Sequence, residues 1–73
     1  MTNAWVVRAA LEQAGEELRL EMVATREING RTEYTADIVA VDHPAEARAE
    51  CARFARTLGV ETYSLEDRRA AAA

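Results

Sequence analysis

The decapeptide TREINGRTEY, residues 25–34, constrains the fold more than any other stretch of the chain. Its Asn29-Gly30 pair stands between two runs in which polar and apolar residues alternate. Asn-Gly favours the left-handed backbone of a tight turn, and alternation with a period of two is typical of strands with one buried face. The sequence therefore predicts an antiparallel β-hairpin whose strands cover residues 18–28 and 31–41.

Two registers of this hairpin place the side chains on opposite faces. A two-residue Asn29-Gly30 turn pairs Ile28 with Arg31 and distributes apolar residues over both faces of the sheet. A three-residue loop that begins at Ile28, with Gly30 in a β-bulge, gathers them on one face. The apolar pairs of that second register are Leu18–Ala40, Leu20–Ile38, Met22–Ala36 and Ala24–Tyr34. Because a shift by one residue turns every side chain over, this agreement predicts the bulged register.

The bulged register also predicts an acidic outer face of the sheet. Glu21 then lies directly opposite Asp37, although like charges that face each other across two strands are destabilising. Both carboxylates can turn into water at a small cost, as on an ordinary solvated surface. The alternative is that this face binds a basic surface of a protein partner. The residues predicted for that partner-binding site are Glu21, Asp37, Glu33, Glu27 and Arg19.

Residues 44–58 carry the clearest helical pattern. Pro44 suits the first helical position, with Asp42 or His43 as the capping residue before it. Gly59 suits the left-handed residue that ends a helix. Apolar residues recur at spacings of three and four, which predicts one buried face. Those residues are Ala47, Cys51, Phe54, Ala55 and Leu58.

The segments at either end of the chain fit more than one pattern. Residues 60–65 are rich in β-branched and aromatic side chains and predict a short closing strand, although Ser64 and Asp67 could instead begin a helix with a capping box. In residues 4–14 the Ala, Leu, Glu and Gln content favours a helix, while the run WVV favours a strand. We predict a helix there. A strand in its place gives the order β-β-β-α-β, with the last strand able to lie beside the first.

Together these elements predict one α+β domain over residues 1–67, with the tail 68–73 frayed. The domain consists of a small antiparallel sheet with helix 44–58 packed on one face. The chain has 73 residues, of which 49% are counted as hydrophobic, but many of these are alanines that bury little area. A core of this size is only marginally stabilising, so association with a second copy or a larger partner is a common way for such a chain to gain stability.

Charge and cysteine content indicate the setting of the protein. Thirteen carboxylates against nine arginines leave a net charge of −4, which disfavours unassisted binding to nucleic acid or to an anionic membrane. The single cysteine excludes an intrachain disulfide and favours a reducing compartment. All nine basic residues are arginine, which is typical of a GC-rich bacterial or phage genome. We expect a cytoplasmic protein, of a bacterium or of an infected host.

The sequence offers little for catalysis. Cys51 and His43 are eight residues apart on or beside one helix, and that spacing corresponds to roughly 12 Å along the helix axis, too far for a nucleophile and its base. His43, Glu46 and Glu50 share a helix face but spread along it, which disfavours a metal site. Without lysine, a phosphate-loop lysine and Schiff-base chemistry are excluded. We therefore predict no enzyme activity, no catalytic or metal-binding residues and no cofactor.

The leading functional hypothesis is a small acidic protein-binding module. In its concrete form it is a phage-type inhibitor, anti-restriction or anti-CRISPR-like, that presents carboxylates to a basic nucleic-acid-binding surface. One alternative is a homodimeric structural or regulatory domain that self-associates through a sheet edge or through exposed valines. A second alternative is weak nucleic-acid binding through helix and tail arginines. The valines are Val23, Val39 and Val41, and the arginines are Arg48, Arg53, Arg56, Arg68 and Arg69.

Overall fold

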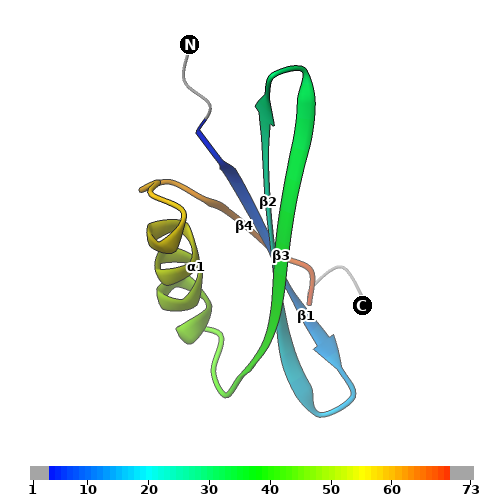
Figure 1. Ribbon diagram of the computed structural model, residues 1–73. Helices are drawn as coiled ribbons and strands as arrows, with labels where there is room; N and C mark the ends of the chain where they lie inside the picture. The colour runs from blue at the N-terminus through cyan, green and yellow to red at the C-terminus, as the bar shows by residue number, and fades with distance from the viewer. Residues whose placement is uncertain (1–3, 70–73) are drawn as a thin grey trace.

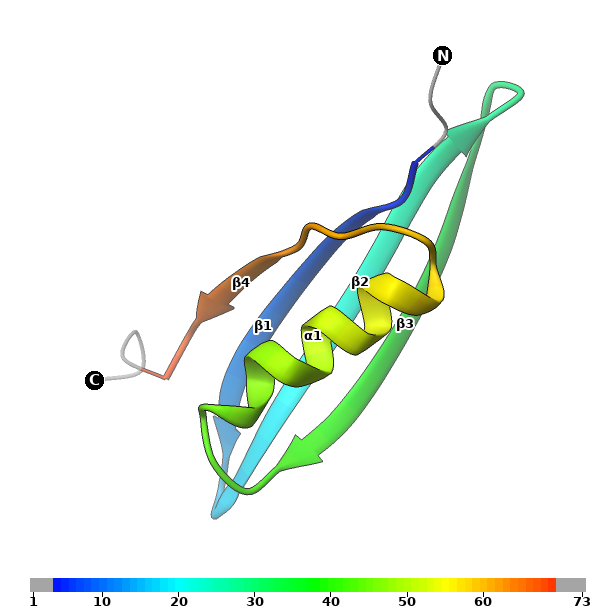
Figure 2. The same cartoon turned by 90° about the vertical axis from the view of Figure 1, so that its left-hand side faces the viewer.

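A computed structural model describes residues 4–69 and shows one four-stranded sheet with a single helix on one face (Figures 1 and 2). The strands lie in the order β3-β2-β1-β4, antiparallel except for β4, which runs parallel to β1. The predicted α+β class is confirmed. The elements are β1 (Val6–Ala14), β2 (Glu17–Ile28), β3 (Arg31–Val41), α1 (Glu46–Thr57) and β4 (Ser64–Asp67).

The predicted N-terminal helix is wrong, and the alternative strand is correct. β1 lies between β2 and β4, so its backbone pairs on both sides. This pairing outweighs the helix propensity of its Ala, Leu, Glu and Gln residues, which is a weak preference. Alternate residues Val7, Ala9 and Leu11 are buried beneath the helix, as a strand with one covered face requires. The order β-β-β-α-β, with β4 beside β1, follows from this strand.

The predicted bulged register of the hairpin is also wrong. Ile28 pairs directly with Arg31, so only two residues form the loop. Both have left-handed backbones, with φ of 53° at Asn29 and 75° at Gly30. This combination is typical of a type I′ turn, whose twist matches that of two antiparallel strands. Turn geometry therefore sets the register, and every side chain of β3 lies on the face opposite to the predicted one relative to β2.

Helix α1 is shorter than the predicted 44–58, and neither Asp42 nor His43 caps it through its side chain. Pro44 precedes the helix in a turn, where its carbonyl accepts a hydrogen bond from the N–H of Ala47. The carboxylate of Glu46 instead reaches back and accepts hydrogen bonds from the backbone N–H of Asp42, at 3.1 Å, and of His43, at 2.9 Å. The predicted side-chain cap is therefore absent, and Glu46 fixes the chain that leads into the helix.

The end of α1 agrees with the prediction at Gly59, whose φ is 77°. The N–H of Gly59 donates to the carbonyl of Arg56, and the N–H of Val60 donates to the carbonyl of Ala55, both at 3.0 Å. These two bonds form a Schellman motif, which satisfies carbonyls at the end of the helix. Val60 and Ala55 belong to the same apolar cluster. The chain therefore leaves the helix at a fixed angle, toward β4.

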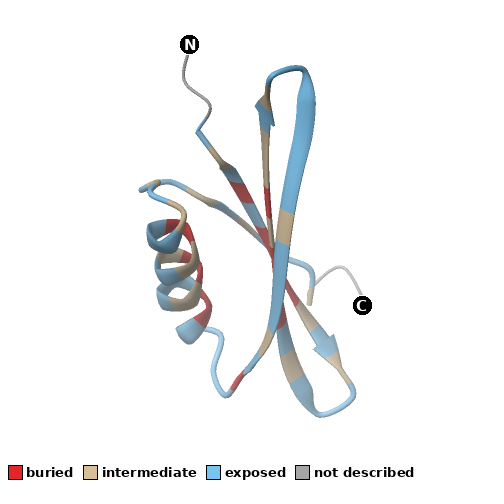
Figure 3. Ribbon diagram, in the orientation of Figure 1, coloured by how far each residue is buried: buried red, intermediate tan, exposed pale blue. Residues whose placement is uncertain are grey.

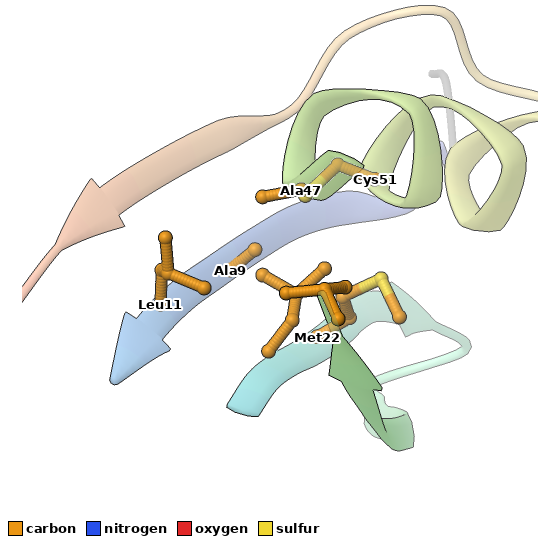
Figure 4. Close-up of a cluster of buried hydrophobic side chains, with 7 residues drawn as sticks. Ala9, Leu11, Met22, Ala47 and Cys51 are labelled. Atoms are coloured by element: carbon orange, nitrogen blue, oxygen red, sulfur yellow. The ribbon is translucent and has the colours of Figure 1, made fainter. Parts of the chain in front are cut away.

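The core lies between α1 and the sheet, as the burial colours of Figure 3 show. Leu20, Ala24, Ala47 and Cys51 are fully buried. In Figure 4 the side chains of Ala47 and Cys51 point from the helix toward Ala9, Leu11 and Met22 on the strands. Small residues on both layers allow α1 to approach the sheet closely. The predicted buried face of the helix is confirmed, with Phe54 and Leu58 partly buried at its edge.

The closing strand is confirmed, but it covers residues 64–67 in place of 60–65. Tyr63 and Leu65 pack on the core from this side. The sheet contact continues past β4, because the N–H of Arg68 donates to the carbonyl of Leu11 at 2.9 Å. Arg68 therefore does not belong to a frayed tail, and residues 70–73 of the predicted tail lie outside the described residues.

Candidate interaction surface on the uncovered sheet face

The sheet has one face covered by α1 and one face over which the structure places no other element of residues 4–69 (Figure 1). Directly paired residues of neighbouring strands share a face. Four rows of such partners lie on the uncovered face, which we call the bare face. The rows are Val6–Thr25–Tyr34, Arg8–Val23–Ala36, Ala10–Glu21–Ile38 and Glu12–Arg19–Ala40.

Apolar side chains gather in these rows. Val6 is 53% exposed, Tyr34 67% and Ile38 59%, and these are the large exposed hydrophobic side chains of the described residues. Val23 is half-buried between them, and Ala36 is exposed. We call the set Val6, Val23, Tyr34, Ala36 and Ile38 the bare-face patch. Scattered exposed apolar residues are normal on a protein, but a contiguous group on one face is typical of a contact surface.

Strand β3 contributes most to the patch and has unusual side-chain chemistry. Its residues on the bare face are uncharged and exposed at every position. Those residues are Thr32, Tyr34, Ala36, Ile38 and Ala40. The charged residues of β3 point to the helix side of the sheet, where Arg31, Glu33 and Asp37 pair with Ile28, Arg26 and Met22 of β2. An exposed edge strand with an uncharged outer row is a surface prone to pairing.

Charges of both signs border the patch. Arg8 and Glu21 lie on the same face, beside an open hollow of about 360 Å³ that is also lined by Val23 and Glu66. Further along β1, Glu12 Oε1 forms an ion pair with Arg68 Nη1 at 3.2 Å. Arg68 Nε also lies 3.0 Å from Glu66 Oε2. The bare face thus combines exposed apolar side chains with charges of both signs, a composition common in protein–protein contacts.

The structure separates the residues predicted to form an acidic face. Glu21, Glu27 and Arg19 lie on the bare face, whereas Glu33 and Asp37 lie on the helix side. Glu21 faces Ile38 and Ala10 in place of Asp37, so the predicted clash of like charges does not exist. The cause is the two-residue turn, which moves β3 by one position relative to the bulged register.

Local partners engage several of these groups. Glu33 accepts a hydrogen bond from Arg26 Nε at 2.6 Å, and that guanidinium also stacks on Trp5, 4.5 Å from the ring centroid. Glu27 accepts a bond from the Thr32 hydroxyl at 3.3 Å, and Arg19 lies 3.6 Å from Glu17. Arg19, Glu27 and Glu33 thus each have a polar partner within the sheet or the adjoining turn.

Of the bare-face patch, only Val23 was predicted to be exposed, and Val39 and Val41, predicted with it, lie on the helix side, where Val41 is buried. The signal for the rest of the patch is present in the sequence. Reading Asn29-Gly30 as a type I′ turn gives the observed pairing and places Tyr34, Ala36 and Ile38 together on the outer face. The bulged register concentrates apolar residues on one side of the sheet, whereas in the structure β3 carries apolar residues on both of its faces.

Chemically reactive groups are few among residues 4–69. Cys51 is fully buried in the core, and burial raises the pKa of its thiol, with a smaller effect of the neighbouring Glu50 carboxylate. The thiol behaves as a small hydrophobic side chain. Within this range no three His, Cys, Asp or Glu side chains cluster closely enough to hold a metal ion.

Most of the arginines proposed for nucleic-acid binding are paired with carboxylates. Arg53 contacts Glu50, Arg68 contacts Glu12 and Glu66, and Arg69 donates to Asp67 at 2.6 Å. The hydrogen bonds from Arg69 lower the pKa of Asp67 from 3.8 to about 2. Such pairing removes much of the positive potential that a phosphate backbone would require.

Comparison of the chain with models of protein families, with curated proteins and with solved structures gives no match. None of the helices in the described part of the chain is long and apolar enough to cross a membrane.

Proposed function

We propose that the chain is a non-enzymatic protein-binding module that docks its bare face on another protein surface. The observation that carries this proposal is the bare-face patch, in which Val6, Tyr34 and Ile38 are each more than half exposed on one uncovered face. Burying such side chains contributes roughly 1.5–3 kcal/mol each, so the patch gives a partner a substantial gain. The complementary surface has an apolar centre and groups of both charges at its border, to meet Arg8 and Glu21.

The rest of the molecule supports binding over catalysis. The thiol of Cys51 is enclosed in the core, and the hollow on the bare face is open and lined by groups of both charges. An enzyme site usually needs a concave, mostly enclosed pocket with converging polar groups. The bare face offers an open surface, which suits a protein partner.

The inhibitor hypothesis, with carboxylates presented to a basic groove, has weaker support than docking through the patch. Its residues are divided between two faces, so a single flat partner cannot contact all of them. The net charge of −4 still favours a basic over an acidic partner. Glu21 and Glu27 remain available on the bare face to contribute to such a contact.

The proposal is tested by comparing two variants that each add one positive charge at an exposed position. Ile38→Arg places the charge in the patch, and Ala49→Arg places it on α1, on the other side of the molecule. Immobilised wild type, Ile38→Arg and Ala49→Arg are exposed to the same bacterial lysate, and captured proteins are identified by mass spectrometry. The expected result is a protein retained by wild type and Ala49→Arg and lost with Ile38→Arg.

Any captured protein is then purified and its affinity for the three chains measured by calorimetry. A loss of tenfold or more with Ile38→Arg alone supports docking through the bare face. Equal affinities for all three chains contradict it. Circular dichroism of each variant establishes that the charge changes the surface and leaves the fold intact.

A further inference from the structure

We infer that the protein partner of this module is a second copy of the chain, joined to the first by antiparallel pairing of two β3 strands. The inference rests on the proposed function and names its partner. The two sheets become one, and the β3 residues of both bare-face patches meet at the joint. Side-chain chemistry and backbone geometry support this contact against the net charge of −4 that each copy carries.

The two edges of the sheet differ in a way that points to β3. β4 has only four residues, and charged side chains occupy positions 66–69 in succession. Short length and consecutive charges are the usual means by which proteins protect an edge from pairing. β3 has 11 residues and pairs with β2 on one side only. Its row on the bare face has no charge, so one of the two edges is protected and the other is open.

Backbone groups of β3 are directed toward the open edge at alternate residues. In a two-residue hairpin the pair that flanks the turn, Ile28 and Arg31, is hydrogen-bonded, and bonded pairs then alternate along the strands. The even-numbered residues of β3, from Thr32 to Ala40, therefore direct N–H and C=O groups away from β2. One of these donors already bonds outside the sheet, since the N–H of Ile38 donates to Asp37 Oδ1 at 3.0 Å.

One register uses the whole strand and places no like charges directly opposite each other. With Ala36 on the two-fold axis, all 11 residues of β3 overlap. Tyr34 of each copy then lies beside Ile38 of the other, and aromatic–β-branched pairs of this kind stabilise a sheet. On the helix side, Thr35 of each copy lies beside Asp37 of the other, so its hydroxyl can donate to the carboxylate. In the dimer the Ile38 N–H donates a hydrogen bond to the carbonyl of Tyr34 in the other copy, in place of Asp37.

Neighbouring registers are less favourable. Moving one copy by two residues in one direction places Glu33 beside Asp37 of the other copy, and moving it in the opposite direction places Asp37 beside its own equivalent. Both contacts oppose like charges. Larger movements shorten the overlap and place either Tyr34 or Ile38 on the axis. An isologous contact with each residue pair used twice is the commonest symmetry of protein dimers.

Variants with one added cysteine test both the contact and its register. Tyr34→Cys, Ala36→Cys and Ile38→Cys are each made in the full chain, in which the native Cys51 is fully buried. Hydrogen-bonded antiparallel partners have Cα atoms about 5.5 Å apart, which suits a disulfide. Under mild oxidation, Ala36→Cys is expected to form a covalent dimer at least tenfold faster than the other two. A parallel set with Cys51→Ala controls for the native thiol.

Two outcomes overturn the inference. Faster cross-linking of Tyr34→Cys or Ile38→Cys contradicts the register centred on Ala36. Equal slow cross-linking of all three, together with a monomeric wild type, contradicts the β3 contact. If wild type is monomeric, the lysate comparison with Ile38→Arg still tests whether the bare face binds another protein. Failure of the dimer and failure of the protein-binding function therefore give different results.

Discussion

Asn29 and Gly30 determine the register of β2 and β3 through their backbone torsions. No atom outside the turn lies within 4 Å of a Cβ built on Gly30, so a larger residue there meets no obstruction, only the cost of a positive φ. That cost is about 1–2 kcal/mol for a residue with a Cβ. Gly30→Ala should therefore lower the free energy of unfolding by about that amount in urea denaturation.

Asn29→Gly is the matched control for this substitution. Glycine adopts the φ of 53° at position 29 without strain, so the free energy of unfolding should change by less than about 0.5 kcal/mol. A Gly30→Ala variant as stable as wild type would contradict the positive φ at position 30 and with it the type I′ turn.

Cys51 reports on the core at the scale of one side chain. Because burial raises its thiol pKa above 9.0 in the folded state, folding favours the protonated thiol. The stabilisation that this raised pKa reflects is present in full below pH 9 and is lost as the pH rises through the pKa of the thiol in the folded state. The free energy of unfolding should therefore fall in alkaline solution. Cys51→Ala should remove this component of the pH dependence. An unchanged alkaline slope in that variant would show that the thiol is accessible to water.

The carboxylate of Asp67 titrates in the opposite sense. Hydrogen bonds from Arg69 lower its pKa to about 2, so their stabilising effect is present above pH 3.8 and is lost as the pH falls through about 2. Arg69→Ala should move the midpoint toward 3.8 in an NMR titration of the carboxyl carbon. The effect on overall stability should be small and sensitive to salt, because the pair is exposed. A midpoint near 3.8 in the wild type would contradict this pairing.

At the scale of elements, the beginning of α1 depends on Glu46. Its carboxylate satisfies two backbone N–H groups that precede the helix and also lies near the positive end of the helix dipole. Glu46→Ala should reduce the free energy of unfolding by about 1 kcal/mol, as measured by chemical denaturation. Arg48→Ala, at an exposed position in the same turn, is the control and should change it by less than about 0.5 kcal/mol. Equal effects of the two substitutions would rule out this role for Glu46.

The elements differ in how far local sequence determined them. The spacing of apolar residues in α1 and the glycine after it were sufficient, because both act within the helix itself. β1 was not predictable from propensity, since its conformation depends on β2 and β4 pairing on either side. The register of β3 failed for a different reason. Concentrating apolar residues on one face is a sound criterion only when the other face is polar. Here the bare face also carries apolar residues, such as Ile38, which remain exposed.

The shift of β3 by one residue also limits what the sequence revealed of the surface. Glu21 and Asp37 were correctly recognised as strand residues, but their relation to each other depended on a shift of one position. In the observed register Ile38 takes the place of Asp37 beside Glu21. The candidate surface therefore changed from an acidic face to an apolar patch with a charged border. Net charge, in contrast, is independent of register and is unaffected by the correction.

At the scale of the whole molecule, the sheet is covered on one side and open along one edge. The extents of 42 × 20 × 15 Å describe an elongated domain, with the long hairpin of β2 and β3 reaching beyond α1 (Figure 2). A small core and an open β3 edge have a common solution in pairing with a second sheet. The bare-face patch and the β3 edge then serve one surface of association.

Sedimentation equilibrium of wild type and Ala36→Pro over a range of concentrations tests this account most directly. Proline at position 36 removes an N–H that we place at the open edge, so it should leave the monomer folded while preventing β3 pairing. The account predicts that wild type reaches twice the monomer mass of 8.1 kDa at micromolar concentration and that Ala36→Pro remains a folded monomer. A wild type that stays at 8.1 kDa throughout, or an Ala36→Pro variant that dimerises equally well, would contradict it.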